Sequence, residues 1–164
     1  MTPVWPHIAI LVFVTLQRLV ELPMARANTK RLIANGGHEV APGHYPFIVA
    51  IHLAWLGSLW VVAPGWPISV PFLALFVAIE ICRAWVLRTL RDRWTTRIIV
   101  MPGETLVTHG PYRFVNHPNY VVVAAEIAVL PMVFGQWQIA LIFSILNAIA
   151  MWIRIKAEND ALGR

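Results

Sequence analysis

Long runs of apolar residues constrain this chain more than any other feature of its sequence. A helix needs about 20 apolar residues to cross the roughly 30 Å hydrocarbon core of a bilayer. The chain of 164 residues is 59% apolar and 13% charged, whereas a soluble domain is usually about 25% charged. These proportions argue against a soluble globular enzyme and against a disordered chain. Five suitable runs follow one another, at residues 3–22, 45–63, 68–87, 118–134 and 137–155.

We therefore expect one all-α domain over residues 1–164, an integral membrane bundle of five transmembrane helices. Breaks that contain Gly or Pro at 64–67 and 135–136 predict tight helical hairpins. The segments 88–117 and 154–164 are expected to lie on the cytoplasmic side. The first of these is too long for a simple connector, and long loops on a rigid scaffold often hold functional residues. We expect a cofactor-binding segment there.

Lysine and arginine residues gather on one side of the predicted membrane. Three lie within 24–43, five within 88–117 and three after residue 153, which makes eleven of the thirteen. The positive-inside rule then predicts an integral membrane protein with its N-terminus outside and its C-terminus in the cytoplasm. Loops that lie against anionic membrane lipid account for the net charge of +5. We therefore expect no nucleic-acid partner.

Several charged residues lie at membrane depth, where an unpaired charge is costly. Arg18 and Glu21 are three residues apart, as are Glu80 and Arg83, so each pair can share a helix face. We interpret these four as helix-end residues that reach the interface or as contacts between helices. Glu126 has no basic neighbour at helical spacing and needs a partner on another helix, for which Arg83 is the obvious candidate. A structural role and a role at the active site are both open for Glu126.

The histidines and the single cysteine do not predict a metal site. No two of the six histidines are four residues apart on one helix face, and no HExxH motif is present. One cysteine cannot form a Cys-based zinc site or an internal disulfide. We expect no bound metal.

The stretch 110–120, which reads GPYRFVNHPNY, gives the strongest signal for chemistry. Gly-Pro at its start predicts a turn, and a proline near its end suits the first turn of a helix. The fourth run is therefore expected to begin here, and a helix N-terminus attracts a carboxylate or another polar ligand group. Helix capping alone would need only Asn116 and Pro118. A ligand site is favoured by the additional polar and aromatic residues Tyr112, His117, Asn119 and Tyr120.

Arg154 and Glu158 give a second signal at the end of the last run. They are four residues apart, so both side chains can point the same way just below the membrane. An ordinary intrahelical salt bridge explains the spacing equally well, although Arg before Glu is the weaker orientation. The spacing alone leaves both interpretations open.

Together these two motifs resemble those of the isoprenylcysteine carboxyl methyltransferase family. That family has a Gly-x-Tyr and an Arg-His-Pro-x-Tyr-x-Gly pattern, followed one helical hairpin later by Arg-x-x-x-Glu. Here the corresponding stretches are GPY at 110–112, NHPNY at 116–120 and RIKAE at 154–158, and ETLV at 104–107 resembles the family's Thr-Leu-Val. Over most of its length the chain also resembles small bacterial members that methylate oxygen on alkylpyrones or alkylresorcinols.

The resemblance implies an S-adenosylmethionine-dependent O-methyltransferase that acts on a lipid-like acceptor in the membrane. The acceptor would be an alkylpyrone or alkylresorcinol hydroxyl, or a prenylcysteine-type carboxylate. Arg154 and Glu158 would be the catalytic pair, Arg154 would face the acceptor oxygen, and Glu126 is a second candidate for substrate contact. Carried over from the family, the residues that would bind the cofactor are Thr105, Leu106, Val107, Tyr112, His117, Pro118, Asn119, Tyr120 and Glu158.

Three positions depart from the family pattern. Asn116 stands where Arg is usual, Val122 where Gly is usual, and Asn159 where a second acid is frequent. These departures concern the acceptor group more than the cofactor.

Two other functions are alternatives to methyl transfer. An NADPH-dependent membrane reductase with a related C-terminal half would need a basic pocket for phosphate, which Arg91, Arg93, Arg97 and Arg113 could supply. A non-enzymatic membrane partner protein would use its charged pairs only for structure. Binding of the two cofactors, and the effect of alanine at His117, separate these alternatives.

Overall fold

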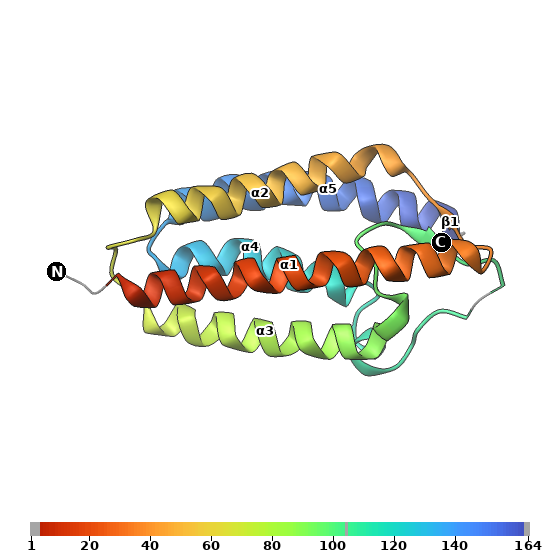
Figure 1. Cartoon of the computed structure of the whole chain (residues 1–164), viewed down its shortest axis with the longest axis horizontal. Helices are drawn as coiled ribbons and strands as arrows, with labels where there is room; N and C mark the ends of the chain where they lie inside the picture. The colour runs from red at the N-terminus through yellow and green to blue at the C-terminus, as the bar shows by residue number, and fades with distance from the viewer. Residues whose placement is uncertain (1–3, 104, 163–164) are drawn as a thin grey trace.

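A bundle of helices forms the body of the protein. The computed structural model describes residues 4–103 and 105–162, so the start of the predicted span 3–22, Glu104 and the end of segment 154–164 lie outside the described residues. Figure 1 shows the helices running along the long axis, with the two termini at opposite ends. The prediction of an all-α membrane bundle is confirmed. In the described residues the five α-helices are α1 (Trp5–Ala34), α2 (Tyr45–Val62), α3 (Val70–Leu90), α4 (Pro118–Val133) and α5 (Trp137–Leu162).

Four of these helices, α1, α2, α3 and α5, are long and apolar enough to cross a bilayer. The remaining one, α4, has 16 residues, which gives a length of about 24 Å, less than the roughly 30 Å of hydrocarbon. The helix begins at Pro118 and is followed by Gly135 in the left-handed region, at φ +68°. Because α4 packs against both α3 and α5, protein rather than lipid covers much of its surface. The fourth run therefore forms a helix, but one shorter than a full span.

The first helix extends beyond the predicted end of its run at residue 22. It continues through Pro23 to Ala34 as one helix of 30 residues. The residues after the proline include good helix formers, and two of them, Ala25 and Asn28, are buried. The helix ends where Gly36 adopts a φ of +94°, as is common at a helix C-terminus. The end of α1 thereby reaches the same region as the end of α3.

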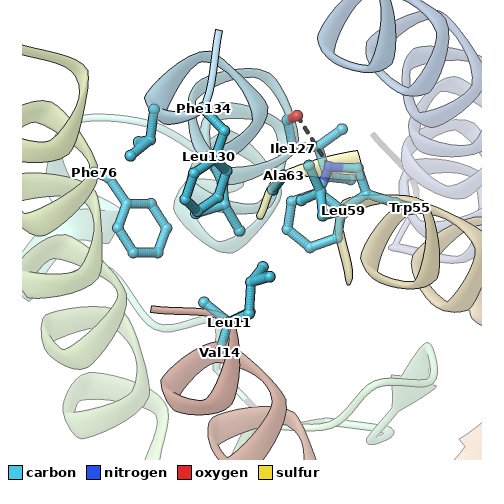
Figure 2. Packing of buried hydrophobic residues seen from close by; sticks show 10 residues of the cluster. Leu11, Val14, Trp55, Leu59, Ala63, Phe76, Ile127, Leu130 and Phe134 are labelled. Carbon is cyan, nitrogen blue, oxygen red and sulfur yellow. Dashed lines mark hydrogen bonds between the residues drawn. The ribbon is translucent and has the colours of Figure 1, made fainter. Parts of the chain in front are cut away.

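The largest apolar core lies where α1, α2, α3 and α4 meet. Trp55 of α2 is buried and donates its indole N–H to the backbone oxygen of Ile127 on α4 at 3.2 Å (Figure 2). Leu11 of α1, Phe76 of α3 and Leu130 of α4 belong to the same cluster. These residues fill the half of the bundle nearer the N-terminus, where the sequence has few charged residues.

A cluster of buried charges joins three helices further along the bundle. Arg83 of α3 donates from Nε to Oε1 of Glu21 on α1 at 2.8 Å and from Nη1 to Oε1 of Glu126 on α4 at 2.9 Å. Arg18 of α1 places Nη2 2.5 Å from Oε2 of Glu126. The predicted pairing of Glu126 with Arg83 is confirmed, and we call Arg18, Glu21, Arg83 and Glu126 the buried charge cluster. Each charge is compensated by a partner on another helix.

Short elements complete the end of the bundle that holds the C-terminus. The strands β1 (His38–Glu39) and β2 (Ile99–Val100) pair antiparallel, with His38 opposite Val100. This small ribbon was not predicted, because two-residue strands leave no periodic signal. It connects the α1–α2 loop to the long segment after α3. Three 3-10 turns lie in the same region, η1 (Pro42–His44), η2 (Arg91–Arg93) and η3 (Gly110–Arg113).

We predict that Arg83→Met lowers the free energy of unfolding by roughly 3–5 kcal/mol, because it leaves two buried carboxylates with one guanidinium fewer. The loss is measured as a lower midpoint in denaturant or thermal unfolding of the detergent-purified protein. The control is Arg26→Met, since Arg26 is an exposed arginine of α1. An Arg83→Met protein as stable as the control would contradict the structural role of the cluster.

Candidate functional site

A cavity of about 210 Å³ lies at the end of the bundle that holds the C-terminus. Its walls come from the ends of α1 and α3, from β2, from η3, from the start of α4 and from the last turns of α5. Two segments far apart in the sequence therefore meet around one space, as the two motifs predict. Nine of the eleven predicted site residues line it, namely Thr105, Leu106, Val107, Tyr112, His117, Asn119, Tyr120, Arg154 and Glu158.

The hydroxyl of Tyr120 connects the two motifs. It accepts a hydrogen bond from Nε of Arg154 at 2.8 Å and donates one to Oε2 of Glu158. No direct ion pair joins Arg154 to Glu158 in the described residues, so the intrahelical salt bridge that the spacing allowed does not form. The tyrosine takes its place, and it ties the first turn of α4 to the end of α5.

Two further contacts fix the orientation of Arg154. Its Nη1 donates to the backbone oxygen of Thr96 at 2.8 Å, and its guanidinium carbon lies 5.1 Å from the centre of the Tyr120 ring. Arg154 is only 6% exposed. Among the described residues nothing hydrogen-bonds to its Nη2. A buried arginine held on two sides with one N–H group unused can bind an oxygen anion.

His117 and the first turn of α4 line the cavity beside Tyr120 and Glu158. The His117 ring stacks on that of Tyr120 at 5.3 Å between centres, and its Nδ1 lies 3.7 Å from Oε1 of Glu158. No side chain caps the helix, and the side-chain oxygen of Asn119 instead accepts from the indole N–H of Trp94 at 3.3 Å. The positive end of the helix dipole thus faces the cavity without a capping group.

Pro118 and Glu126 do not line the cavity. Pro118 is the first residue of α4 and acts on the site by starting the helix there, since a proline lacks only an N–H that has no partner in the first turn. Glu126 is 1% exposed and belongs to the buried charge cluster. Its carboxylate is occupied by Arg18 and Arg83.

Tyr112 reaches the cavity from η3. Burial, followed by the negative charge of Glu158, raises the pKa of the Tyr112 phenol above its usual value. The group therefore stays protonated at neutral pH and is available as an O–H donor. It can bind an anionic or carbonyl oxygen in the cavity.

Sequence reasoning missed the wall made by residues 95–101. Arg97 pairs with Glu39 of β1 at 2.7 Å and lies over the Tyr45 ring at 4.3 Å from its centre. Thr96 donates its hydroxyl to that of Tyr45 at 3.3 Å. Nothing in the spacing of Tyr45 and residues 94–100 indicates that these two stretches meet. The contacts hold the backbone oxygen that orients Arg154.

Close packing of η3 on α3 positions Tyr112. Gly110 has a φ of +62°, and a Cβ added there would lie 2.6 Å from Oγ1 of Thr89. Gly103 has a similar φ of +75°, but a Cβ there would meet nothing within 4 Å. The two glycines therefore share the conformational requirement and differ only in the contact.

We predict that Gly110→Ala lowers the melting temperature by several degrees more than Gly103→Ala. Both variants strain the backbone by a similar amount, and only Gly110→Ala also pushes η3 away from α3. The measurement is thermal unfolding of both variants beside the unmodified protein. Equal losses would show that the packing of η3 on Thr89 does not constrain the site.

Comparisons with known proteins identify a family and a relative that the chain resembles. Residues 72–164 match the family described as "Isoprenylcysteine carboxyl methyltransferase (ICMT) family". The chain is also 35% identical over 165 aligned residues to the uncharacterized protein YpbQ of Bacillus subtilis (strain 168), and the alignment covers 96% of this chain and 95% of that protein. No solved structure matches.

The matched region contains all but the first two residues of α3, the long segment after it, α4 and α5. It therefore includes the nine predicted residues that line the cavity. The match extends over more than half of the chain, and it brings together both motifs with the helices that position them. The chain belongs to the isoprenylcysteine carboxyl methyltransferase family.

Proposed function

We propose that the protein is an S-adenosylmethionine-dependent O-methyltransferase that modifies a lipid-like acceptor at the membrane. Membership of the family indicates a membrane methyltransferase. The observation that supports the finer proposal is the single cavity in which Arg154, Glu158 and the uncapped N-terminus of α4 meet. A methyltransferase mainly has to position an oxygen nucleophile in line with the methyl group and exclude water, and buried, oriented polar groups suit that task.

The residues around the cavity fit the cofactor chemically. S-adenosylmethionine supplies an electrophilic methyl group on a cationic sulfonium. The N-terminus of α4 suits its carboxylate, and Glu158 offers the negative charge for its ammonium group. Apolar side chains for the adenine come from Val100, Met101 and Leu106 on the other wall. Tyr120 keeps Glu158 in place, so the charge is present before the cofactor binds.

Arg154 is the group that would bind the acceptor oxygen. Its unused Nη2 can donate to an oxygen anion, and its permanent charge lowers the pKa of a nearby hydroxyl. Tyr120 and the backbone oxygen of Thr96 hold the guanidinium. The same arrangement suits an alkylpyrone or alkylresorcinol hydroxyl and a prenylcysteine-type carboxylate.

Arginine and lysine residues support an orientation with this end of the bundle in the cytoplasm. The C-terminus and the long basic segment lie at the same end, as the positive-inside rule requires. The water-soluble cofactor would then enter from the cytoplasm of a bacterial cell, and the lipid-like acceptor from the inner membrane. Access from two phases explains why so small an enzyme is built into a bilayer.

Two of the four arginines invoked for an NADPH-dependent reductase, Arg91 and Arg113, are not among the residues that line the cavity. The other two have contacts of their own, and Arg97 is paired with Glu39 and covers the Tyr45 ring. Arg93 donates to the backbone oxygen of Thr105. A cofactor with phosphate groups would have to displace the contacts of Arg93 and Arg97, which favours methyl transfer over the reductase.

We predict that Arg154→Ala lowers turnover by at least about 100-fold. In other enzymes, removing one oriented donor at a reacting oxygen has an effect of this size. Turnover is measured by mass spectrometry of lipid extracts from cells with and without the protein, as the appearance of a product one CH2 unit heavier. Lys156→Ala is the matched control, because Lys156 is an exposed cation on the same helix. Near-full methylation by a well-folded Arg154→Ala protein would contradict the role of Arg154.

S-adenosylhomocysteine is predicted to raise the melting temperature of the detergent-purified protein, and NADPH is predicted not to. A ligand at 100 times its Kd stabilises the folded state by about 2.7 kcal/mol. Glu158→Ala should remove most of the shift without unfolding the protein. A shift with NADPH alone would favour the reductase, and no shift with either compound would favour a non-enzymatic partner.

A further inference from the structure

An aromatic and basic patch lies on the outside of α3 and η3, beyond the cavity. Phe114, just after η3, contacts Trp85 of α3 edge to face at 6.3 Å between ring centres. Both remain accessible, at 63% for Phe114 and 46% for Trp85. Arg113 lies over the Phe114 ring at 4.5 Å, and Arg88 follows Trp85 by three residues, which puts both on one face of the helix. We call these four residues the interfacial patch.

The depth of the interfacial patch follows from the length of α3. Its 21 residues span about 31 Å, close to the hydrocarbon thickness of a bilayer. Trp85 lies five residues before the last residue of α3, and therefore about 7 Å inside the end of the helix. Because Phe114 touches Trp85, it lies at the same depth, among the acyl chains just inside the headgroups. The long arginine side chains can reach outward to the headgroups.

The charge of the interfacial patch is not neutralised by the protein. Arg88 and Arg113 are both exposed, and neither has an acidic partner among the described residues. This differs from Arg18 and Arg83 in the buried charge cluster, which are matched by carboxylates. Two unpaired guanidinium groups at headgroup depth, with aromatic rings beneath them, are complementary to a phosphate head on an acyl chain.

We propose that the interfacial patch binds an anionic phospholipid, with its headgroup on Arg88 and Arg113 and its acyl chain along Trp85 and Phe114. Such a lipid lies next to the site, because Arg113 and Phe114 directly follow Tyr112, which lines the cavity. It does not enter the site, because none of the four patch residues is among those that line the cavity. The lipid would contact the exposed side of η3, while Thr89 of α3 packs against its other side at Gly110. This proposal does not depend on the proposed methyl transfer.

The test is native mass spectrometry of the full chain with phosphatidylglycerol or phosphatidylcholine, two lipids that differ in headgroup charge. We expect phosphatidylglycerol to bind more tightly than phosphatidylcholine by roughly five-fold for each arginine. The double variant Arg88→Gln and Arg113→Gln should lose that preference. A matched control, Arg26→Gln with Lys30→Gln, removes the same charge from exposed residues of α1 and should keep it. Equal binding of the two lipids to the unmodified protein, or a preference that survives in the double variant, would overturn the proposal.

A second measurement tests the depth of the interfacial patch separately from its charge. A spin label at Phe114→Cys, in a Cys82→Ser background that removes the only native cysteine, reports contact with oxygen dissolved in lipid or with a water-soluble nickel reagent. We expect the label to respond mainly to oxygen in reconstituted membranes. A label that responds mainly to the nickel reagent would place Phe114 in water and would overturn the lipid site.

Discussion

The hydroxyl of Tyr120 holds together the two parts of the chain on which the proposed chemistry depends. It lies between a guanidinium and a carboxylate from the last turns of α5, and it comes from the first turn of α4. The tyrosine keeps Arg154 and Glu158 apart, so that neither neutralises the other. Each can therefore bind a ligand group in the cavity, Arg154 as a cation and Glu158 as an anion. A direct salt bridge between them would have used both charges.

The rest of the bundle explains how this contact is maintained in a lipid environment. The buried charge cluster ties α1 to α3 and α4, and in hydrocarbon such charges have no solvent alternative. The apolar core fixes the half near the N-terminus (Figure 2). Because α4 is shorter than the spans beside it, the walls of the cavity come from the ends of its longer neighbours. The mismatch in helix length thus leaves room for the candidate site, which β2 and η3 help to enclose.

Much of this arrangement could be predicted from local sequence, and the remainder could not for physical reasons. Runs of apolar residues show helices directly, and Pro118 marks where α4 begins because proline suits a first helical turn. The pairing of Glu126 with Arg83 followed from the cost of burying a lone charge. The continuation of α1 past Pro23 was missed, since buried contacts there outweigh a local break. The contacts of Arg97 with Glu39 and Tyr45 could not be predicted, because contacts between distant segments produce no periodic pattern in the sequence.

We propose that the end of α5 and the start of α4 enclose one binding site. An experimental structure of the protein in a lipid environment with S-adenosylhomocysteine tests this proposal most directly. We expect ligand density between the first turn of α4 and Glu158, with the Tyr120 hydroxyl still between Arg154 and Glu158. Ligand bound elsewhere, or packed side chains separating His117 from Arg154, would contradict the claim.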